Sequence, residues 1–252
     1  MDNKVEYNRY NESSAKRLET ISSYIFSTAN DFPEYLRHPY IFYVEQISNL
    51  IKPQMRVLEL CCGDGIHTID LARTGAKITS TDIAENSIEL ASIRLEREGY
   101  RNVTFEVADA EDLGNFSENA YDVVTCVGSL SYVDLDKFIH GIKRVLNKEG
   151  VFICLDSFNH NPVYSANRYV NYLLGRRSFS TIKRMPKEAT LSVFKNEFAS
   201  FEVYYFGIFS FLGRFLELLF NSSRAKLIIN NLDIKFYKFR KYAFKVVFVC
   251  SK

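Results

Sequence analysis

The sequence predicts an α/β fold in which helices cover both faces of a doubly wound, mainly parallel sheet. Between residues 56 and 155, five short apolar runs alternate with stretches of helical spacing. This alternation is typical of strand–helix–strand units with right-handed crossovers, so the strands end at one edge of the sheet. Gly63 and Gly65 follow the first apolar run directly. A tight glycine turn at this place in such a fold opens a ligand site.

The elements of this core are expected in a regular order. A helix is predicted to start at Ile66, because apolar residues recur from there at helical spacing. Gly150 stands just after a later helix, where glycine favours the end of a helix. The other expected elements are strands at 57–61, 76–82, 103–108, 121–127 and 151–155, and helices at 85–98 and 134–146.

The segments outside the core are expected to elaborate a single domain of residues 1–252. Residues 1–52 show helical spacing and are divided by Pro33 and Pro39, which predicts at least two helical pieces. The core then occupies residues 53–157. After it we expect a basic insertion, irregular or helical, at 158–185, a helix at 186–199, strands at 201–206 and 242–250, and a second insertion at 207–241.

Composition limits the class of protein. The chain has no run of 18 or more apolar residues, which argues against a spanning helix, and its N-terminal stretch is too polar for a secretory signal. Its five cysteines lie mostly in apolar strand-like runs and lack the spacing of metal ligands. They are interpreted as core residues in a reducing compartment, which predicts a cytoplasmic protein.

The net charge of +2 conceals an uneven distribution. Residues 1–159 carry 16 basic and 25 acidic side chains, a net charge of −9, whereas residues 160–252 carry 16 and 5, a net charge of +11. Such a division suggests that the C-terminal third faces an anionic partner. A solvated basic face that balances the acidic part is the alternative interpretation.

The glycine turn differs from a dinucleotide-binding fingerprint. That fingerprint would require glycine at positions 61, 63 and 66, where the chain has Cys61, Gly63 and Ile66. Glu59 lies at the end of the preceding strand. Its carboxylate would repel a pyrophosphate but suits a ligand that carries an ammonium group.

The stretch from Glu59 to Gly65 resembles motif I of the class I S-adenosylmethionine-dependent methyltransferases, in which an acidic residue precedes Gly-x-Gly-x-Gly. Cys61 stands where that family usually has its first glycine, and because cysteine is small we expect the loop to persist. Asp82 follows Gly65 by 17 residues, near the spacing of an acid that hydrogen-bonds a ribose. The resemblance covers about residues 55–157.

The resemblance implies a Rossmann-like fold with an antiparallel last strand, and S-adenosyl-L-methionine as the cofactor. It also implies that residues 1–52 cover the cofactor and that residues 53–157 bind it. The acid of the Asp-Ala pair after the third strand would accept from the adenine amine. The cofactor-binding residues that it implies are Glu59, Cys61, Gly63, Asp64, Gly65, Asp82, Ile83, Asp109, Ala110, Val127, Gly128 and Tyr132.

Methyl transfer to a hydroxyl group also requires a base, and three residues are the favoured candidates. Asp156 ends the fifth strand, His160 lies four residues later, and His38 lies in the N-terminal connection. Asp156 is alternatively a loop cap and His160 a surface residue. His67, beside the glycine turn, is interpreted as a helix-packing residue. The chain has no metal-ligand spacing, so no metal site is predicted.

A small-molecule acceptor is favoured over a nucleic acid. Family members that methylate the amino groups of DNA bases or glutamine usually carry Asn-Pro-Pro-[Tyr/Phe] after the fourth strand, where this chain has Val127-Gly-Ser-Leu. The chain is loosely similar to methyltransferases from bacterial surface-polysaccharide gene sets. This similarity favours a hydroxyl of a sugar, nucleotide-sugar or lipid-linked sugar. Two alternatives remain open: a non-catalytic module that binds the cofactor, and an RNA or DNA methyltransferase.

The insertion at 207–241 carries the clearest indication of the acceptor. An apolar patch within residues 209–220 is followed by basic residues. This pattern is compatible with a lid over an anionic or amphipathic acceptor, a peripheral membrane contact, a dimer interface, or a helix packed on the sheet. The sequence leaves the oligomeric state undetermined.

Overall fold

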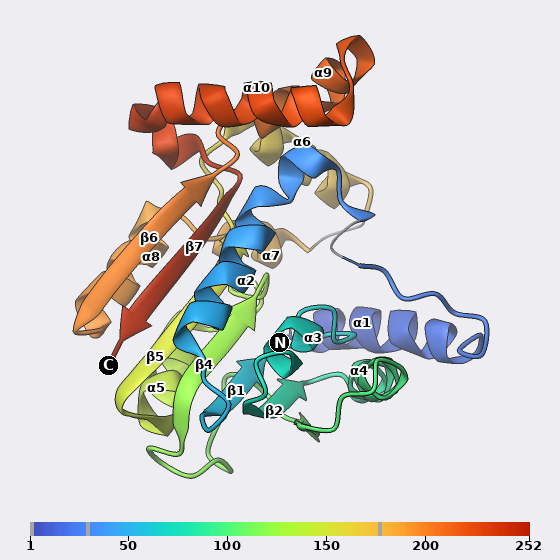
Figure 1. Cartoon of the computed structure of the whole chain (residues 1–252), viewed down its shortest axis with the longest axis vertical. Helices are drawn as coiled ribbons and strands as arrows, with labels where there is room; N and C mark the ends of the chain where they lie inside the picture. Colours follow the sequence, from blue (N-terminus) through green and yellow to red (C-terminus); the bar gives the residue numbers. More distant parts are fainter. Residues whose placement is uncertain (1–2, 29–30, 176–177) are drawn as a thin grey trace.

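The computed structural model describes residues 3–28, 31–175 and 178–252. These residues form one seven-stranded sheet in the order β3-β2-β1-β4-β5-β7-β6 (Figure 1). Strand β7 pairs antiparallel with both of its neighbours, whereas the pairs from β3 to β5 are parallel, as predicted. The strands are β1 (Arg56–Leu60), β2 (Lys77–Asp82), β3 (Val103–Val107), β4 (Tyr121–Val127), β5 (Leu146–Ser157), β6 (Ser200–Phe206) and β7 (Lys245–Ser251).

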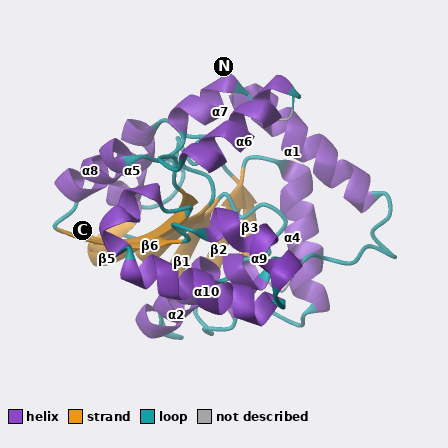
Figure 2. Cartoon of the chain, turned by 90° about the horizontal axis from the view of Figure 1, so that it is seen from above, coloured by secondary structure: helices purple, strands orange, loops and turns teal. Residues whose placement is uncertain are grey.

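Helices cover both faces of the sheet (Figure 2). Successive side chains of a strand point to opposite faces. Accordingly, Val57 of β1 packs with Tyr43 and Leu71 on one face, whereas Leu58 packs with Phe138 on the other. The α-helices are α1 (Asn3–Leu18), α2 (His38–Leu50), α3 (Thr68–Ala72), α4 (Glu85–Arg97), α5 (Leu135–Val145), α6 (Pro162–Leu173), α7 (Phe179–Arg184), α8 (Glu188–Glu197), α9 (Gly213–Leu219) and α10 (Ser222–Lys235). Short 3-10 helices are η2 (Glu34–Leu36), η3 (Ser210–Leu212) and η4 (Tyr237–Tyr242).

Two local predictions were wrong. Strand β5 begins at Leu146, directly after α5, because the backbone of Leu146 is extended and not helical. Leu146 pairs with Tyr121 of β4, and the register of this pair of strands shifts between Tyr121 and Val123. Gly150 therefore lies inside a strand and does not end a helix. A Cβ atom there would lie 2.8 Å from Leu146 Cδ2, so a larger residue would require the Leu146 side chain to shift. The first helix after the glycine turn begins at Thr68, later than Ile66, because the turn continues through residue 67.

Both insertions fold into helices at the edge where the parallel strands end. Residues 158–185 contribute α6 and α7, and residues 207–241 contribute η3, α9, α10 and η4. Lys245 pairs with Ser157 at the end of β5 and with Phe206 at the end of β6, so the second insertion leaves and rejoins the sheet at this edge. Across the described ranges, no helix has both the length and the apolarity needed to cross a bilayer.

Candidate active site

A cavity of about 330 Å³ opens at the edge of the sheet where the parallel strands end. Its lining comes from the ends of β1, β2, β3 and β4 and from the N-terminal segment that lies over them. Eleven of the twelve predicted cofactor residues line it: Glu59, Cys61, Gly63, Asp64, Asp82, Ile83, Asp109, Ala110, Val127, Gly128 and Tyr132.

The loop after β1 turns by means of three left-handed residues. The φ angles of Cys61, Gly63 and Gly65 are 58°, 56° and 78°. A Cβ at Gly63 would meet nothing within 4 Å, so this glycine leaves open space beside the backbone. Gly65 does not line the cavity. A Cβ there would lie 3.1 Å from Ala91, so Gly65 allows α4 to pack closely against the loop.

Asp82 connects the end of β2 to this loop. Its Oδ2 accepts a hydrogen bond from Gly63 N at 2.9 Å, and its Oδ1 accepts one from Ala84 N at 2.9 Å. Burial raises the pKa of the carboxyl, and the two backbone donors oppose that rise. The carboxylate thus shapes the loop and also borders the cavity. After β3, the side chain of Asp109 is similarly oriented by a hydrogen bond from Glu111 N at 2.9 Å.

Glu59 is a buried acid at the edge of the cavity, with 3% of its surface exposed. Thr68 Oγ1 and Ser80 Oγ both donate to its Oε2 at 2.7 Å. Burial raises the pKa of Glu59 to about 7, although both hydroxyl groups favour the charged form. A carboxylate fixed in this way, away from bulk water, is suited to a cationic ligand group.

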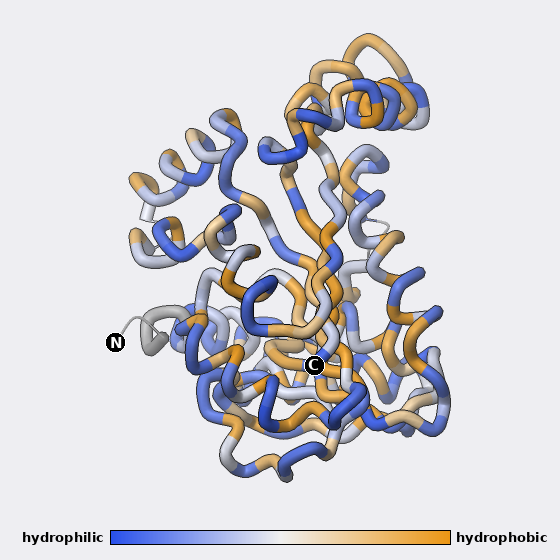
Figure 3. Tube along the Cα trace, turned by 90° about the vertical axis from the view of Figure 1, so that its left-hand side faces the viewer, coloured by the Kyte–Doolittle hydropathy of each residue, from blue (hydrophilic) through white to orange (hydrophobic). Residues whose placement is uncertain are grey.

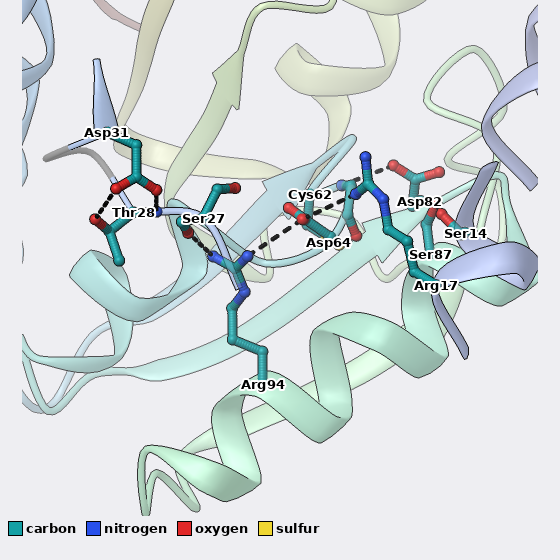
Figure 4. Close-up of polar contacts among 11 residues, drawn as sticks. Ser14, Arg17, Ser27, Thr28, Asp31, Cys62, Asp64, Asp82, Ser87 and Arg94 are labelled. Atoms are coloured by element: carbon teal, nitrogen blue, oxygen red, sulfur yellow. Dashed lines mark hydrogen bonds and ion pairs between the residues drawn. The ribbon is translucent and has the colours of Figure 1, made fainter. Parts of the chain in front are cut away.

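Asp64 borders the cavity, and its carboxylate is held by two arginines (Figure 4). Its Oδ2 accepts from Arg17 of α1 and from Arg94 of α4, both at 3.2 Å. Arg94 is buried and also donates to Ser27 O at 3.2 Å. The sequence motif predicted a cofactor contact at Asp64. In the structure this residue also links the glycine loop to the N-terminal helix through its ion pair with Arg17.

The structure does not bring the three candidate bases to this cavity. Asp156 is buried beneath the loop after β4 and accepts from Leu130 N at 2.8 Å, so it positions that loop. His160 accepts from the Glu188 backbone N–H through Nε2 at 3.1 Å, at the start of α8. His38 begins α2, packs its ring 5.0 Å from that of Phe206, and borders a separate small pocket.

The sequence reasoning missed a group of aromatic and basic residues in the cavity. Tyr10 donates to the Tyr132 hydroxyl at 3.0 Å. Tyr40 stacks on His67 at 5.6 Å between ring centroids, and the ammonium of Lys245 lies 5.1 Å from the Tyr40 centroid. Lys245 is 7% exposed. These residues come from α1, α2, the glycine loop and the last strand, so only the folded chain brings them together.

His67 has a larger part in this group than packing alone. It lines the cavity, and burial together with the nearby charges of Lys245 and Arg94 lowers its pKa to about 4. Its imidazole is therefore neutral near pH 7. Histidine directly after a glycine turn was the available signal, but the stacking on Tyr40 depends on where α2 packs.

Comparison with known proteins agrees with the fold. A family model described as a methyltransferase domain matches residues 51–196. The demethylmenaquinone methyltransferase of Leptospira interrogans is 37% identical over 117 residues, which cover 45% of this chain and 47% of that protein. The ubiquinone biosynthesis O-methyltransferase of Bordetella bronchiseptica is 32% identical over 107 residues, which cover 42% of this chain and 44% of that protein. The chain therefore spans less than half the length of these relatives.

Two solved structures share the fold. Phosphoethanolamine N-methyltransferase 2 of Haemonchus contortus, in complex with S-adenosyl-L-methionine, has a TM-score of 0.58 at 17% identity, over 84% of this chain and 52% of that one. Geranyl diphosphate C-methyltransferase of Streptomyces coelicolor has a TM-score of 0.58 at 14% identity, over 84% of this chain and 80% of that one. Together with the family match over more than half of its length, this shows that the chain belongs to the class I S-adenosylmethionine-dependent methyltransferases.

Proposed function

We propose that this protein transfers the methyl group of S-adenosylmethionine to a hydroxyl group of a sugar, carried as a nucleotide-sugar or a lipid-linked sugar. S-adenosylmethionine supplies a methyl group on a sulfonium. The chain's contribution is to hold this donor and the acceptor in contact, and such positioning can supply much of the rate. The observation that carries the proposal is the composition of the cavity, whose lining combines acidic and glycine positions with tyrosines and a buried lysine.

The acidic side of the cavity suits the cofactor. Glu59 offers a buried carboxylate to an ammonium group, Asp82 offers one to ribose hydroxyls, and Asp109 one to the adenine amine. Gly63 leaves room for a ligand against the backbone, since a side chain there would project into open space. These residues fit S-adenosylmethionine in the roles that the sequence motif predicts.

The tyrosines and the lysine of the cavity suit an acceptor with hydroxyl and anionic groups. Tyr10 and Tyr132 present paired hydroxyl groups, which match the polar edge of a sugar. Lys245 places a buried ammonium among aromatic rings, where an acceptor phosphate or carboxylate would be strongly favoured. Asp156, His160 and His38 have no contact with this space, so the proposal assigns none of them the role of base.

A quinol-type acceptor is the second candidate. The names of the relatives from Leptospira and Bordetella motivate it. The aromatic rings of Tyr40, Tyr10 and Tyr132 at the cavity would also accommodate a planar ring. Because those relatives match less than half of their own length, their acceptors are a guide to what should be assayed.

The first test is calorimetric titration of S-adenosylhomocysteine into wild type, Asp82→Ala and Asp136→Ala. We expect Asp82→Ala to weaken binding by about tenfold or more, because one charge-assisted hydrogen bond is worth about 1.5–3 kcal/mol and the glycine loop loses its support. Asp136, an exposed acid at the start of α5, is the matched control and should leave the affinity unchanged. Failure of folded wild type to bind would contradict the proposal.

The acceptor is then sought with S-adenosylmethionine labelled in its methyl group. Product from a nucleotide-sugar or lipid-linked sugar supports the first candidate, and product from a demethylated quinol supports the second. Cofactor binding without transfer to either class would favour a non-catalytic module. Labelled RNA or DNA, with binding that weakens steeply as salt rises, would favour a nucleic-acid methyltransferase.

A further inference from the structure

The helical insertion between β6 and β7 exposes large apolar side chains on the outer faces of two helices. In α9, Phe215, Leu218 and Leu219 are spaced i, i+3 and i+4, so they share one helix face. They are 60%, 82% and 59% exposed. The opposite face carries Gly213, which is buried so closely against the ring of Tyr35 that a Cβ would overlap it. The helix thus rests on the protein through Gly213 and directs three large apolar groups away from it.

Helix α10 repeats this arrangement. Ala225 and Ile229 are buried against the protein, at 0% and 1% exposure. Leu227 and Ile234 are seven residues apart, which is two turns, and they lie opposite that buried pair. They are 60% and 75% exposed. Monomeric proteins in water seldom keep a group of apolar side chains this exposed without a partner.

The charges of the same segment are mainly positive, and most of its basic side chains are exposed. Residues 207–241 contain seven basic side chains and two acidic ones. Both acids are engaged locally: Asp233 accepts from Gly207 N and Phe209 N, and Glu217 accepts from Ser222 Oγ. Six of the basic residues are exposed, namely Arg214, Arg224, Lys235, Lys238, Arg240 and Lys241. In Figure 3 this segment lies at the top, where hydrophobic and hydrophilic colours alternate along the trace.

We propose that the outer faces of α9 and α10, with the basic residues around them, form a surface that docks on an anionic lipid bilayer. The apolar side chains would enter the boundary between headgroups and acyl chains, and the arginines and lysines would contact the lipid headgroups. The charge favours this partner over a second copy of the chain, because two copies would bring together surfaces of the same sign.

The position of this surface explains what docking would achieve. Helices α9 and α10 lie beyond the ends of β6 and β7 (Figure 1). The segment rejoins the sheet through Lys245, which lines the cavity. A bilayer at this surface would therefore lie on the side of the molecule where the parallel strands end. In the lipid-linked version of the proposed function, docking would bring the cavity and its acceptor to the same surface.

The test is co-sedimentation with vesicles of phosphatidylcholine alone or mixed with phosphatidylglycerol, without cofactor or acceptor. Wild type is expected to bind the mixed vesicles and to bind the neutral ones weakly. Leu218→Asp with Ile234→Asp should lower binding by about tenfold or more, since each removes an apolar group that the bilayer would bury. Lys235→Glu with Lys238→Glu should lower binding to anionic vesicles by about fivefold for each basic residue lost.

The control is Ile25→Asp, which places the same acid at an apolar residue that is 88% exposed and far from the segment along the chain. It should bind as wild type does. Equal binding by all variants, or no binding of wild type to anionic vesicles, would overturn the inference. So would a wild-type dimer in light scattering that Leu218→Asp converts to monomer, because the surface would then join two copies. Since no cofactor is present, these outcomes leave the proposed methyl transfer untouched.

Discussion

At the scale of single residues, Cys61 departs most from what its position requires. Its φ of 58° is left-handed, a conformation that glycine adopts freely and that disfavours a residue with a Cβ by about 1–2 kcal/mol. The resemblance to motif I places Cys61 where the family usually has glycine, and the backbone here has the left-handed conformation that a glycine would adopt. The loop persists, as predicted, with this residue in a disfavoured conformation.

Substitution at Cys61 should separate backbone strain from side-chain loss. Cys61→Gly is expected to stay within about 1 kcal/mol of wild type, because relief of strain offsets the greater freedom of the unfolded chain. Cys61→Val should be about 2 kcal/mol less stable than Cys61→Gly, since β-branched residues are especially disfavoured at positive φ. Urea unfolding measures both variants. Equal stability of the glycine and valine variants would contradict this account.

At the scale of elements, helix α1 is attached to the core by polar contacts. Ser14 and Ser87 hydroxyls lie 3.0 Å apart, Asn86 N donates to Asn11 Oδ1 at 3.0 Å, and Arg17 pairs with Asp64. Polar contacts contribute less to stability than a packed apolar face, so we expect α1 to open at a lower cost than the helices of the core. Because α1 carries Tyr10, its opening would admit ligands to the cavity.

Arg17→Ala should loosen α1 with little effect on global stability. The Arg17 side chain is 40% exposed, and ion pairs of that kind contribute about 0.2–1 kcal/mol. We expect faster amide hydrogen exchange in α1 and weaker binding of S-adenosylhomocysteine, with an almost unchanged Tm. Lys16→Ala removes the same charge from an exposed neighbouring position and serves as the control. If the rates of amide hydrogen exchange in α1 are the same in both variants, the Arg17–Asp64 ion pair does not stabilise the packing of α1.

At the scale of the whole molecule, two buried groups beside the cavity couple stability to pH in opposite directions. Glu59 has its pKa raised from 4.5 to about 7, so between these values the folded state holds the extra proton and stability falls as pH rises. His67 has its pKa lowered from 6.5 to about 4, so the unfolded state holds the extra proton and stability rises with pH. Between about pH 4.5 and 6.5 the two contributions oppose each other.

Replacing either group should reveal the pH dependence of stability that the other group contributes. Glu59→Gln is expected to make the free energy of unfolding rise from pH 4.5 to 6.5, and His67→Asn to make it fall, each by at most about 1.4 kcal/mol per pH unit. Wild type should change less than either variant. Urea unfolding at several pH values provides the measurement. Parallel profiles for the three proteins would show that neither group titrates as its burial implies.

The sequence alone determined the order of core strands and the chemistry at their ends. Short apolar runs, the glycine turn and acids such as Asp82 and Asp109 are encoded locally, and parallel strands necessarily end at one edge. That is why eleven predicted cofactor residues line one cavity. Gly65 was the exception, because its requirement arises from the approach of α4, which a spacing pattern does not reveal.

Only the tertiary structure decided which other residues share the cavity with them. Tyr10, Tyr40 and Lys245 reach the cavity from segments far apart in the chain, and their positions depend on how α1, α2 and the last strand pack. The same packing directs Asp156 to the backbone of Leu130 and His160 to the start of α8, away from the cavity. Residue type and spacing specify which groups are available, whereas long-range packing specifies which of them face one another.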